Sequence, residues 1–176
     1  MKHSRNSYDW LGHGMYFWEF DPERAHAYAK ALAVKRAKGP EINVPGVLGA
    51  VIDLGNCLDL MDYRNLTMVK HAYDSLLAGA EGDHEILPKN KRDLRSGDVL
   101  LRDLDCAVIE LLHEIWVHDL EQPPFDSVRG VFWEGNELYP NAGFREKDHI
   151  QICVRNPNCI KGFFLPRKED VKFQPV

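Results

Sequence analysis

Short apolar runs bounded by polar residues predict five strands in this chain. Residues 15–18 read Met-Tyr-Phe-Trp, and residues 47–54 form a second, mostly apolar run. Three further runs lie near the end of the sequence, at residues 127–133, 149–154 and 159–165. Apolar and aromatic runs of this length are typical of buried or half-buried strands. We therefore expect two strands early in the chain and three that close it.

The first helix is predicted between the two early strands. Asp21 is a favourable N-cap, Pro22 suits the first helical position, and Gly39 is a favourable ending. Apolar and aromatic side chains at helical spacing form its inward stripe. These are Ala25, Tyr28, Ala29 and Leu32.

Two more helices are expected in the middle of the chain. Residues 63–77 carry apolar side chains at helical spacing, and Gly79 and Gly82 are expected to end that helix. The stretch from Gly82 to Gly97 is polar and irregular, and residues 99–116 carry the third helical pattern.

Helices inserted between the early strands, followed by strands alone, indicate an α+β fold. A doubly wound fold would place a strand after each helix, and this pattern does not. Gly12 and Gly14 do not form a dinucleotide fingerprint, because a third glycine is absent and a strand follows them.

Length and composition favour one globular domain over residues 1–176. Of the 176 residues, 44% are hydrophobic and 28% charged, and no apolar run reaches the ~18 residues of a membrane span. The first residues resemble no secretory signal. A formal net charge of −5 argues against an extended nucleic-acid surface. We therefore expect a soluble, cytoplasmic protein.

The cysteine pattern predicts reduced side chains in a cytosolic core. Four cysteines are spread over the chain without a Cys-x-x-Cys pair. His149 and Cys153 have the spacing of half a zinc site, but no second pair accompanies them. No metal is expected.

The aromatic segment at residues 10–18 is the first candidate for a binding site. Taken alone, Trp-Leu-Gly-His-Gly-Met-Tyr-Phe-Trp has a structural interpretation, a turn that enters a core strand. Two glycines two positions apart also permit close approach by a ligand.

The order of motifs resembles the ADP-ribosyltransferases of the poly(ADP-ribose) polymerase-like and diphtheria-toxin-like type. Residues 12–17 (Gly-His-Gly-Met-Tyr-Phe) and the helix with Ala27-Tyr28 resemble the Gly-x-Gly-Ile-Tyr-Phe … Ala-x-Tyr segment of those enzymes. Residues 125–128 resemble their Tyr-Asp-Ser-Val segment, and residues 149–154 fall where they carry a catalytic glutamate. The set also resembles small bacterial or phage proteins.

The resemblance implies an ADP-ribosyltransferase-like split antiparallel sheet and NAD as co-substrate. Carried over, Tyr16 would pack beside the nicotinamide ribose, and Tyr28 would stack on the nicotinamide ring. The remaining cofactor contacts would come from Gly12, His13, Gly14 and Ser127. Tyr28 has the alternative interpretation of a core tyrosine, and His13 that of a solvent-facing loop residue.

At the catalytic position this chain has Gln151. Glutamine can hydrogen-bond a ribose but carries no full negative charge, so its electrostatic contribution would be weaker than that of glutamate. Three interpretations follow: a nearby acid substitutes, the activity is modest, or the domain binds without reacting. The acids weighed as substitutes are Glu19, Glu134, Glu137 and Glu146.

The family also begins with a strand bearing His-Gly, about twenty residues before the position of Gly12. His3 is too near the next motif to take that place. The expectation is therefore a domain that lacks this first strand or a sequence that starts after it. Residues 139–148 fall where the family has its target-recognition loop, and a solvated hairpin loop is the alternative.

Catalysis would then rest on Gln151 and Tyr16, in a transferase that passes ADP-ribose from NAD to a macromolecular acceptor. A toxin or phage-defence role, with an antitoxin or inhibitor partner, is implied by the resemblance alone. The alternatives are an inactive NAD- or partner-binding module of the same fold, and an NAD glycohydrolase. A nuclease or hydrolase built on His149 has no motif spacing in its favour.

Overall fold

The computed structural model describes residues 2–35, 43–94 and 96–167, which form two compact units. The first unit comprises Met1–Glu19 and Leu54–Cys159, and the second comprises Phe20–Asp53 and Ile160–Val176. The prediction of one domain over residues 1–176 stays a prediction.

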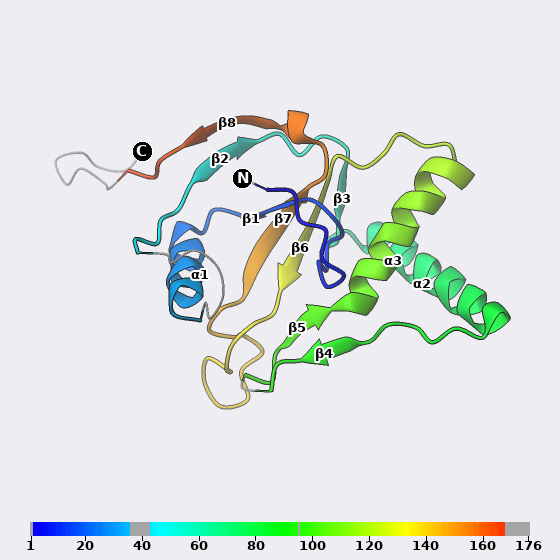
Figure 1. Ribbon diagram of the computed structural model, residues 1–176, viewed down its shortest axis with the longest axis horizontal. Helices are drawn as coiled ribbons and strands as arrows, with labels where there is room; N and C mark the ends of the chain where they lie inside the picture. Colours follow the sequence, from blue (N-terminus) through cyan, green and yellow to red (C-terminus); the bar gives the residue numbers. More distant parts are fainter. Residues whose placement is uncertain (1, 36–42, 95, 168–176) are drawn as a thin grey trace. The chain divides into compact units, whose positions relative to one another are not determined.

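The first unit is built on a four-stranded sheet in the order β1-β7-β6-β3 (Figure 1). Its strands are β1 (Met15–Trp18), β3 (Cys57–Asp59), β6 (Ser127–Phe132) and β7 (His149–Val154). The pairs β1–β7 and β6–β7 are antiparallel, whereas β3 runs parallel to β6. The sheet is therefore mixed, and the α+β class is confirmed. The antiparallel sheet implied by the resemblance holds for the pairs among β1, β7 and β6 but not for β3, and the ADP-ribosyltransferase fold itself stays a prediction.

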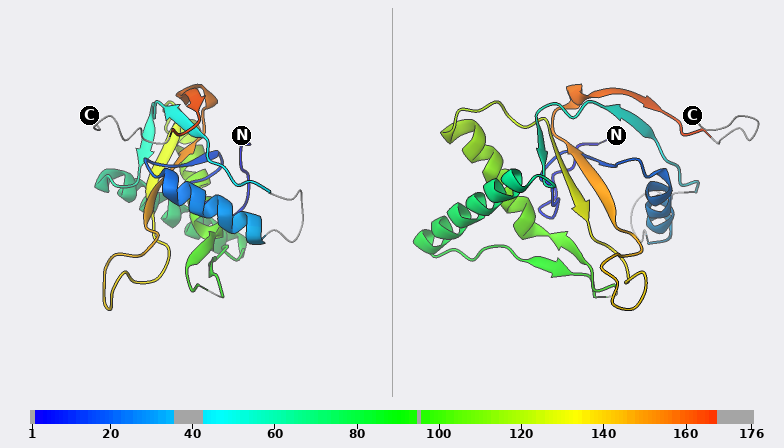
Figure 2. Two further views of the ribbon diagram at one scale, coloured as in Figure 1. Left: turned by 90° about the vertical axis from the view of Figure 1, so that its left-hand side faces the viewer. Right: turned by 180° about the vertical axis from the view of Figure 1, so that it is seen from behind.

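Helices α2 (Tyr63–Asp83) and α3 (Asp103–Glu114) lie side by side in this unit (Figure 2). A π-helical turn, Ile115–Asp119, extends α3. Side chains of both helices form one buried cluster with the sheet, and burial of such apolar surface is the main force that holds the unit together. Its members are Leu11, Leu58, Ala72, Val108, Ile109, Leu112, Phe125, Val128 and Cys153.

The expected end of the second helix is wrong. The helix passes through Gly79 and Gly82 and ends where His84 takes the left-handed conformation (φ 57°) and donates its backbone N–H to Ala80. Neither glycine has a neighbour within 4 Å of the position that a Cβ would take, so both lie in open space. An exposed glycine costs a helix only about 1 kcal/mol, which is too little to end it.

The expected start of the third helix is also wrong. Residues at its predicted beginning form β5 (Val99–Arg102), which pairs with β4 (Asn90–Arg92) within a stretch predicted to be irregular. The helix begins at Asp103 because a distant side chain caps it. The Oδ1 atom of Asn90 accepts the backbone N–H groups of Leu104 and Asp105 at 3.0 and 3.2 Å.

The second unit contains α1 (Pro22–Lys35) and a two-stranded sheet of β2 (Gly49–Ile52) and β8 (Ile160–Phe164). Asp21 caps α1 as predicted, because its Oδ1 atom accepts the N–H of Arg24 at 2.8 Å. The expected ending at Gly39 lies outside the described residues. Tyr28 and Leu32 keep 43% and 39% of their surface exposed, so the predicted inward stripe of α1 is only partly buried.

Candidate functional site

Strand β7 places Gln151 in the middle of the sheet of the first unit. Its backbone lies opposite Trp18 on β1 and Gly130 on β6. Because side chains alternate along a strand, Gln151 shares its face of the sheet with His149 and Cys153. The same face carries Val128 and Cys153, which belong to the buried cluster under α3. Gln151 therefore lies at the edge of the core.

A row of hydrogen bonds fixes the Gln151 carboxamide. The indole Nε1 of Trp10 donates to Gln151 Oε1 at 2.7 Å, and Gln151 Nε2 lies 2.8 Å from His149 Nε2. His149 Nδ1 lies 2.6 Å from the carbonyl oxygen of Lys147. This Trp10–Gln151–His149 row crosses from the N-terminal loop to the start of β7.

Trp10 is held in place from three directions. A Cβ built on Gly130 would lie 2.9 Å from the Trp10 ring, so the ring lies directly on the backbone of β6. The ring meets Phe132 edge-on at 5.4 Å between centroids. The guanidinium carbon of Arg102 lies 4.8 Å from the centroid of Trp10 and 4.4 Å from that of Phe132.

Arg102 thus brings a mostly buried positive charge next to the row. Its side chain is 16% exposed and lies 3.8 Å from a carboxylate oxygen of Asp105. Burial lowers the pKa of Arg102 from its ordinary value, and Asp105 acts in the opposite direction. The aromatic faces of Trp10 and Phe132 provide part of the electrostatic compensation that water would otherwise supply.

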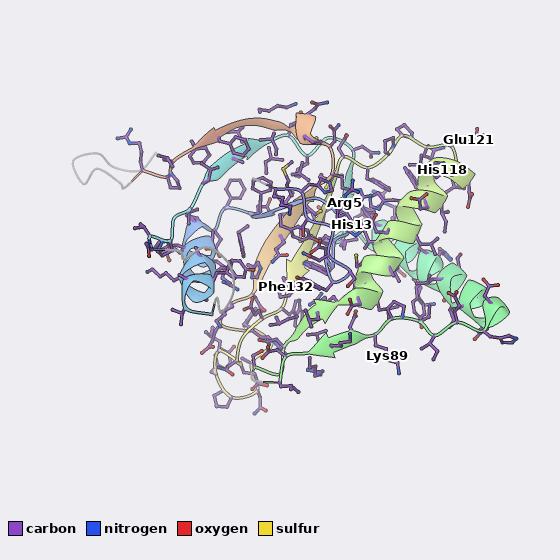
Figure 3. The ribbon with its side chains drawn as sticks, viewed as in Figure 1. Arg5, His13, Lys89, His118, Glu121 and Phe132 are labelled. Atoms are coloured by element: carbon purple, nitrogen blue, oxygen red, sulfur yellow. The ribbon has the colours of Figure 1, made fainter. Side chains whose placement is uncertain are left out.

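The turn at Gly12–Gly14 lies beside the middle of α3, where His13 contacts Glu110; Figure 3 labels His13. Gly12 has φ +80°, a conformation that favours glycine. A Cβ on Gly12 would meet the Glu110 and Arg155 side chains, and one on Gly14 would meet Cys153. Both glycines are thus required by packing within the chain.

The backbone groups of this turn have partners inside the protein. Gly12 N–H donates to Asp9, and Gly14 exchanges two hydrogen bonds with Ser4. His13 N–H donates to Glu110 at 2.8 Å, and the His13 carbonyl accepts from Arg155 at 3.3 Å. A cofactor that used these groups would therefore compete with existing hydrogen bonds.

Tyr16 closes the same turn from the sheet. Its hydroxyl donates to the Gly12 carbonyl at 2.9 Å and accepts the Leu11 N–H at 3.0 Å. Burial raises the pKa of the Tyr16 phenol above its ordinary value, and Cys153 adds to that shift. Tyr16 is therefore a neutral hydroxyl that stabilises the turn, on the same face of the sheet as Gln151.

A charged cluster on α3 adjoins His13. Glu110 forms an ion pair with Arg155 at 2.5 Å, and its other oxygen lies 3.4 Å from His13 Nδ1. Burial acts to raise the pKa of Glu110, but the hydrogen bonds from Arg155 and the His13 N–H lower it below its ordinary value. Glu110 is thus an anion already neutralised by Arg155.

The Cys106 thiol completes this cluster, with Sγ 3.9 Å from His13 Nε2. The order of thiol, imidazole and carboxylate resembles a nucleophilic triad. Burial, and then Glu110, raise the pKa of Cys106 to about 11. The thiol therefore stays protonated at neutral pH, unlike the thiolate that such chemistry requires.

The other two predicted cofactor contacts are Ser127 and Tyr28. Ser127 has no exposed surface, and its hydroxyl donates to the Leu54 carbonyl at 2.7 Å. Tyr28 lies on α1 in the second unit. Both assignments stay predictions, and Ser127 has a structural role that needs no ligand.

The acids considered as substitutes for a catalytic glutamate are engaged elsewhere. Glu19 forms an ion pair with Arg129 at 2.6 Å, on the opposite face of the sheet from Gln151. Glu137 and Glu146 accept backbone N–H groups of Asn141 and Asn136 within the β6–β7 loop. The Glu134 backbone joins the base of that loop to Lys147 and Asp148.

Neither a disulfide nor a metal cluster emerges in the described ranges. Cys106, Cys153 and Cys159 are buried, as the core interpretation predicts, and Cys57 is partly buried. No three metal-ligating side chains gather within residues 2–35, 43–94 and 96–167. In the same ranges no helix combines the length and apolar content needed to cross a membrane.

Two residues near the candidate site, Arg102 and Glu110, were missed from the sequence, and Trp10 was included in the candidate segment 10–18 without a role of its own. An isolated glycine inside a strand signals close approach by another group, and Gly130 carries that signal for Trp10. Glu110 is a charged residue between two apolar pairs of α3, Val108-Ile109 and Leu111-Leu112, four positions after Cys106. Arg102 had no such signal, because its position was assigned to a helix.

Comparisons of the chain with protein-family models, with curated proteins and with solved structures give no match.

Proposed function

We propose that this protein is an NAD-dependent ADP-ribosyltransferase, which transfers ADP-ribose from NAD to a macromolecular acceptor. The observation that carries the proposal is the oriented carboxamide of Gln151. It lies on the central strands at the position where the sequence resemblance expects the catalytic group, and two neighbours fix its direction.

In this reaction Gln151 would supply only hydrogen bonds and a partial negative charge. The bond between the ribose C1′ and nicotinamide breaks, nicotinamide leaves with the electron pair, and positive charge develops on the sugar. A lone pair of the acceptor then forms the new bond to C1′, and the acceptor loses a proton to solvent. Gln151 Oε1 has a second lone pair and Nε2 a second N–H beyond the row. These groups would position a ribose hydroxyl and offer a partial negative charge.

A second candidate is a binding module of the same fold without catalysis. Gln151 carries no charge, and Glu110, whose carboxylate accepts the His13 N–H in the Gly12–Gly14 turn, is paired with Arg155. These two observations favour that alternative. NAD hydrolysis, with water as acceptor, would use the same groups as the transferase.

The test is incubation with NAD labelled on the adenylate part, with cell lysate as the source of acceptor. We expect label on a macromolecule with the natural protein, and loss of it with Gln151→Ala. Free labelled ADP-ribose alone would instead indicate a glycohydrolase. NAD that stays intact, while it raises the melting temperature of the protein, would contradict catalysis and support the binding module.

Gln151→Glu is the most direct test of the proposed role of Gln151. A carboxylate at this position can still accept from the Trp10 indole, so the variant keeps that neighbour. The full negative charge should raise the rate of nicotinamide release at least about tenfold. Gln122→Glu makes the same change at an exposed position outside the row, where the side-chain amide donates to the Leu120 carbonyl, and it should leave the rate unchanged. An equal or lower rate for Gln151→Glu would count against the proposed role of Gln151.

A further inference from the structure

The Trp10–Gln151–His149 row has a defined direction of donation. An indole N–H can only donate, so the atom of Gln151 that faces Trp10 must be the carboxamide oxygen. The carboxamide nitrogen then faces His149 and donates to Nε2. At the other end, the Lys147 carbonyl can only accept, so the Nδ1 atom of His149 carries the proton. Both ends of the row require the same neutral tautomer of His149.

Protonation of His149 would break this row. A protonated imidazole presents an N–H at Nε2, which would face the N–H of the Gln151 carboxamide. Turning the carboxamide would satisfy His149 but would place an N–H against the Trp10 indole N–H. The packing of Trp10 against Gly130, Phe132 and Arg102 keeps that indole from moving aside.

Further described groups surround His149. Trp18 and Phe132, at 6.2 and 5.5 Å between ring centroids, are uncharged neighbours. Arg102 on β5 lies over the Phe132 ring, and its positive charge also disfavours a protonated His149. Lys147 and Asp148 precede His149 in the chain, and the Asp148 carboxylate accepts the N–H groups of Glu134 and Arg145.

We propose that Trp10 is a positioning residue that, through Gln151, keeps His149 neutral. The consequence for catalysis rests on the proposed function. A neutral His149 adds no positive charge beside the place where the ribose becomes positive, and it leaves Gln151 oriented toward that ribose. Trp10 thereby acts on the reaction without touching the substrate.

The decisive variant is Trp10→Phe, which keeps an aromatic ring on Gly130 and removes the indole N–H. Freed from Trp10, the Gln151 carboxamide can turn its oxygen toward His149. The midpoint of the His149 titration, followed by NMR of the imidazole, should then rise by about half a pH unit or more. In a Gln151→Ala background, Trp10→Phe should have no such effect.

Trp116→Phe is the matched control. Its indole also donates a hydrogen bond, to the Pro123 carbonyl at 2.9 Å, but it lies outside the row. This variant should leave the His149 titration unchanged. An unchanged midpoint in folded Trp10→Phe would overturn the proposal.

A measurement on the natural protein covers the case in which Trp10→Phe does not fold. The nitrogen chemical shifts of His149 at neutral pH should report a proton on Nδ1 and none on Nε2. A proton on Nε2 would overturn the proposal without any variant.

The two proposals fail separately. If NAD is turned over, Trp10→Phe should lower kcat more than it raises KM, and the loss should deepen in acid. If the natural protein turns over no NAD, the proposed function fails, and the His149 titration still decides the role of Trp10.

Discussion

At the scale of single residues, the first unit buries polar side chains in two different ways. Trp10, Gln151 and His149 satisfy one another, as buried polar groups generally must. The hydrogen-bonding groups of the buried His113 side chain on α3 are satisfied only in part. Its Nδ1 atom lies 2.7 Å from the Ile109 carbonyl, whereas Nε2 is buried without a hydrogen-bond partner in the part of the chain that the structure describes. A half-satisfied imidazole in a core makes stability depend on pH.

We expect His113 to destabilise the fold in acid. Burial, and then the charge of Arg155, lower its pKa from 6.5 to about 4. Between these values the unfolded chain binds a proton that the folded protein does not, so stability falls as the pH drops through this window. The full effect is about 3 kcal/mol. Urea unfolding at a series of pH values measures it.

His113→Leu is the test of that assignment, because it replaces the imidazole with an apolar side chain of similar size. The variant should lose less stability than the natural protein between about pH 6.5 and about pH 4. Parallel curves for the two proteins would show that other groups cause the acid sensitivity.

At the scale of elements, local sequence patterns were sufficient for two strands but not for the start of α3 or for β3. The strands over 15–18 and 149–154 are confirmed with the predicted bounds, because apolar runs and aromatic residues are local signals. The start of α3 depends on Asn90, a residue more than ten positions away, and no local pattern contains it. Strand β3 has three residues, too few for any periodicity to reveal.

The candidate site was predictable to a similar extent. The sequence located Gln151 on a strand and Tyr16 on the neighbouring strand, and both lie on one face of the sheet. It did not locate the partners of Gln151. Trp10 reaches Gln151 through tertiary packing, and His149, two positions earlier on the same strand, was not assigned to the site. Assignments that rest on the resemblance, such as Tyr28 on nicotinamide, stay predictions.

Glycines in α2 permit a test at this scale. Gly79→Ala and Gly82→Ala should each stabilise the protein by about 0.5–1 kcal/mol, because both positions are helical and a new Cβ meets no atom within 4 Å. Chemical denaturation of each variant gives the change in the free energy of unfolding.

Gly97→Ala is the control for that prediction. It also lies in open space, but its φ of +75° is unfavourable for alanine. This variant should lose stability by roughly 1 kcal/mol. Destabilisation by Gly79→Ala would mean that α2 ends earlier than in the structure.

At the scale of the whole molecule, the two units differ in how much core they contain. Every fully buried hydrophobic side chain among the described residues belongs to the first unit. The second unit has one helix and a two-stranded sheet, and Phe163 and Phe164 on β8 are each 51% exposed. Two-stranded sheets have little stability of their own.

Hydrogen exchange should therefore separate the units. We expect amides of β6 and β7 to exchange only through global unfolding, and those of β2 and β8 to exchange through local opening at a lower free energy. Exchange monitored by NMR or mass spectrometry across a urea series measures both. Equal opening free energies for β7 and β8 would contradict this order and indicate one cooperative unit.

The chain crosses between the units near Glu19, Leu54 and Cys159, and β6 secures the first two crossings. Arg129 binds the Glu19 carboxylate, and the Ser127 hydroxyl binds the Leu54 carbonyl. A mechanical load on the second unit would therefore be transmitted to β6 through these two contacts, at Arg129 and at Ser127. The strand that supports Trp10 is also the strand that would bear tension from the rest of the molecule.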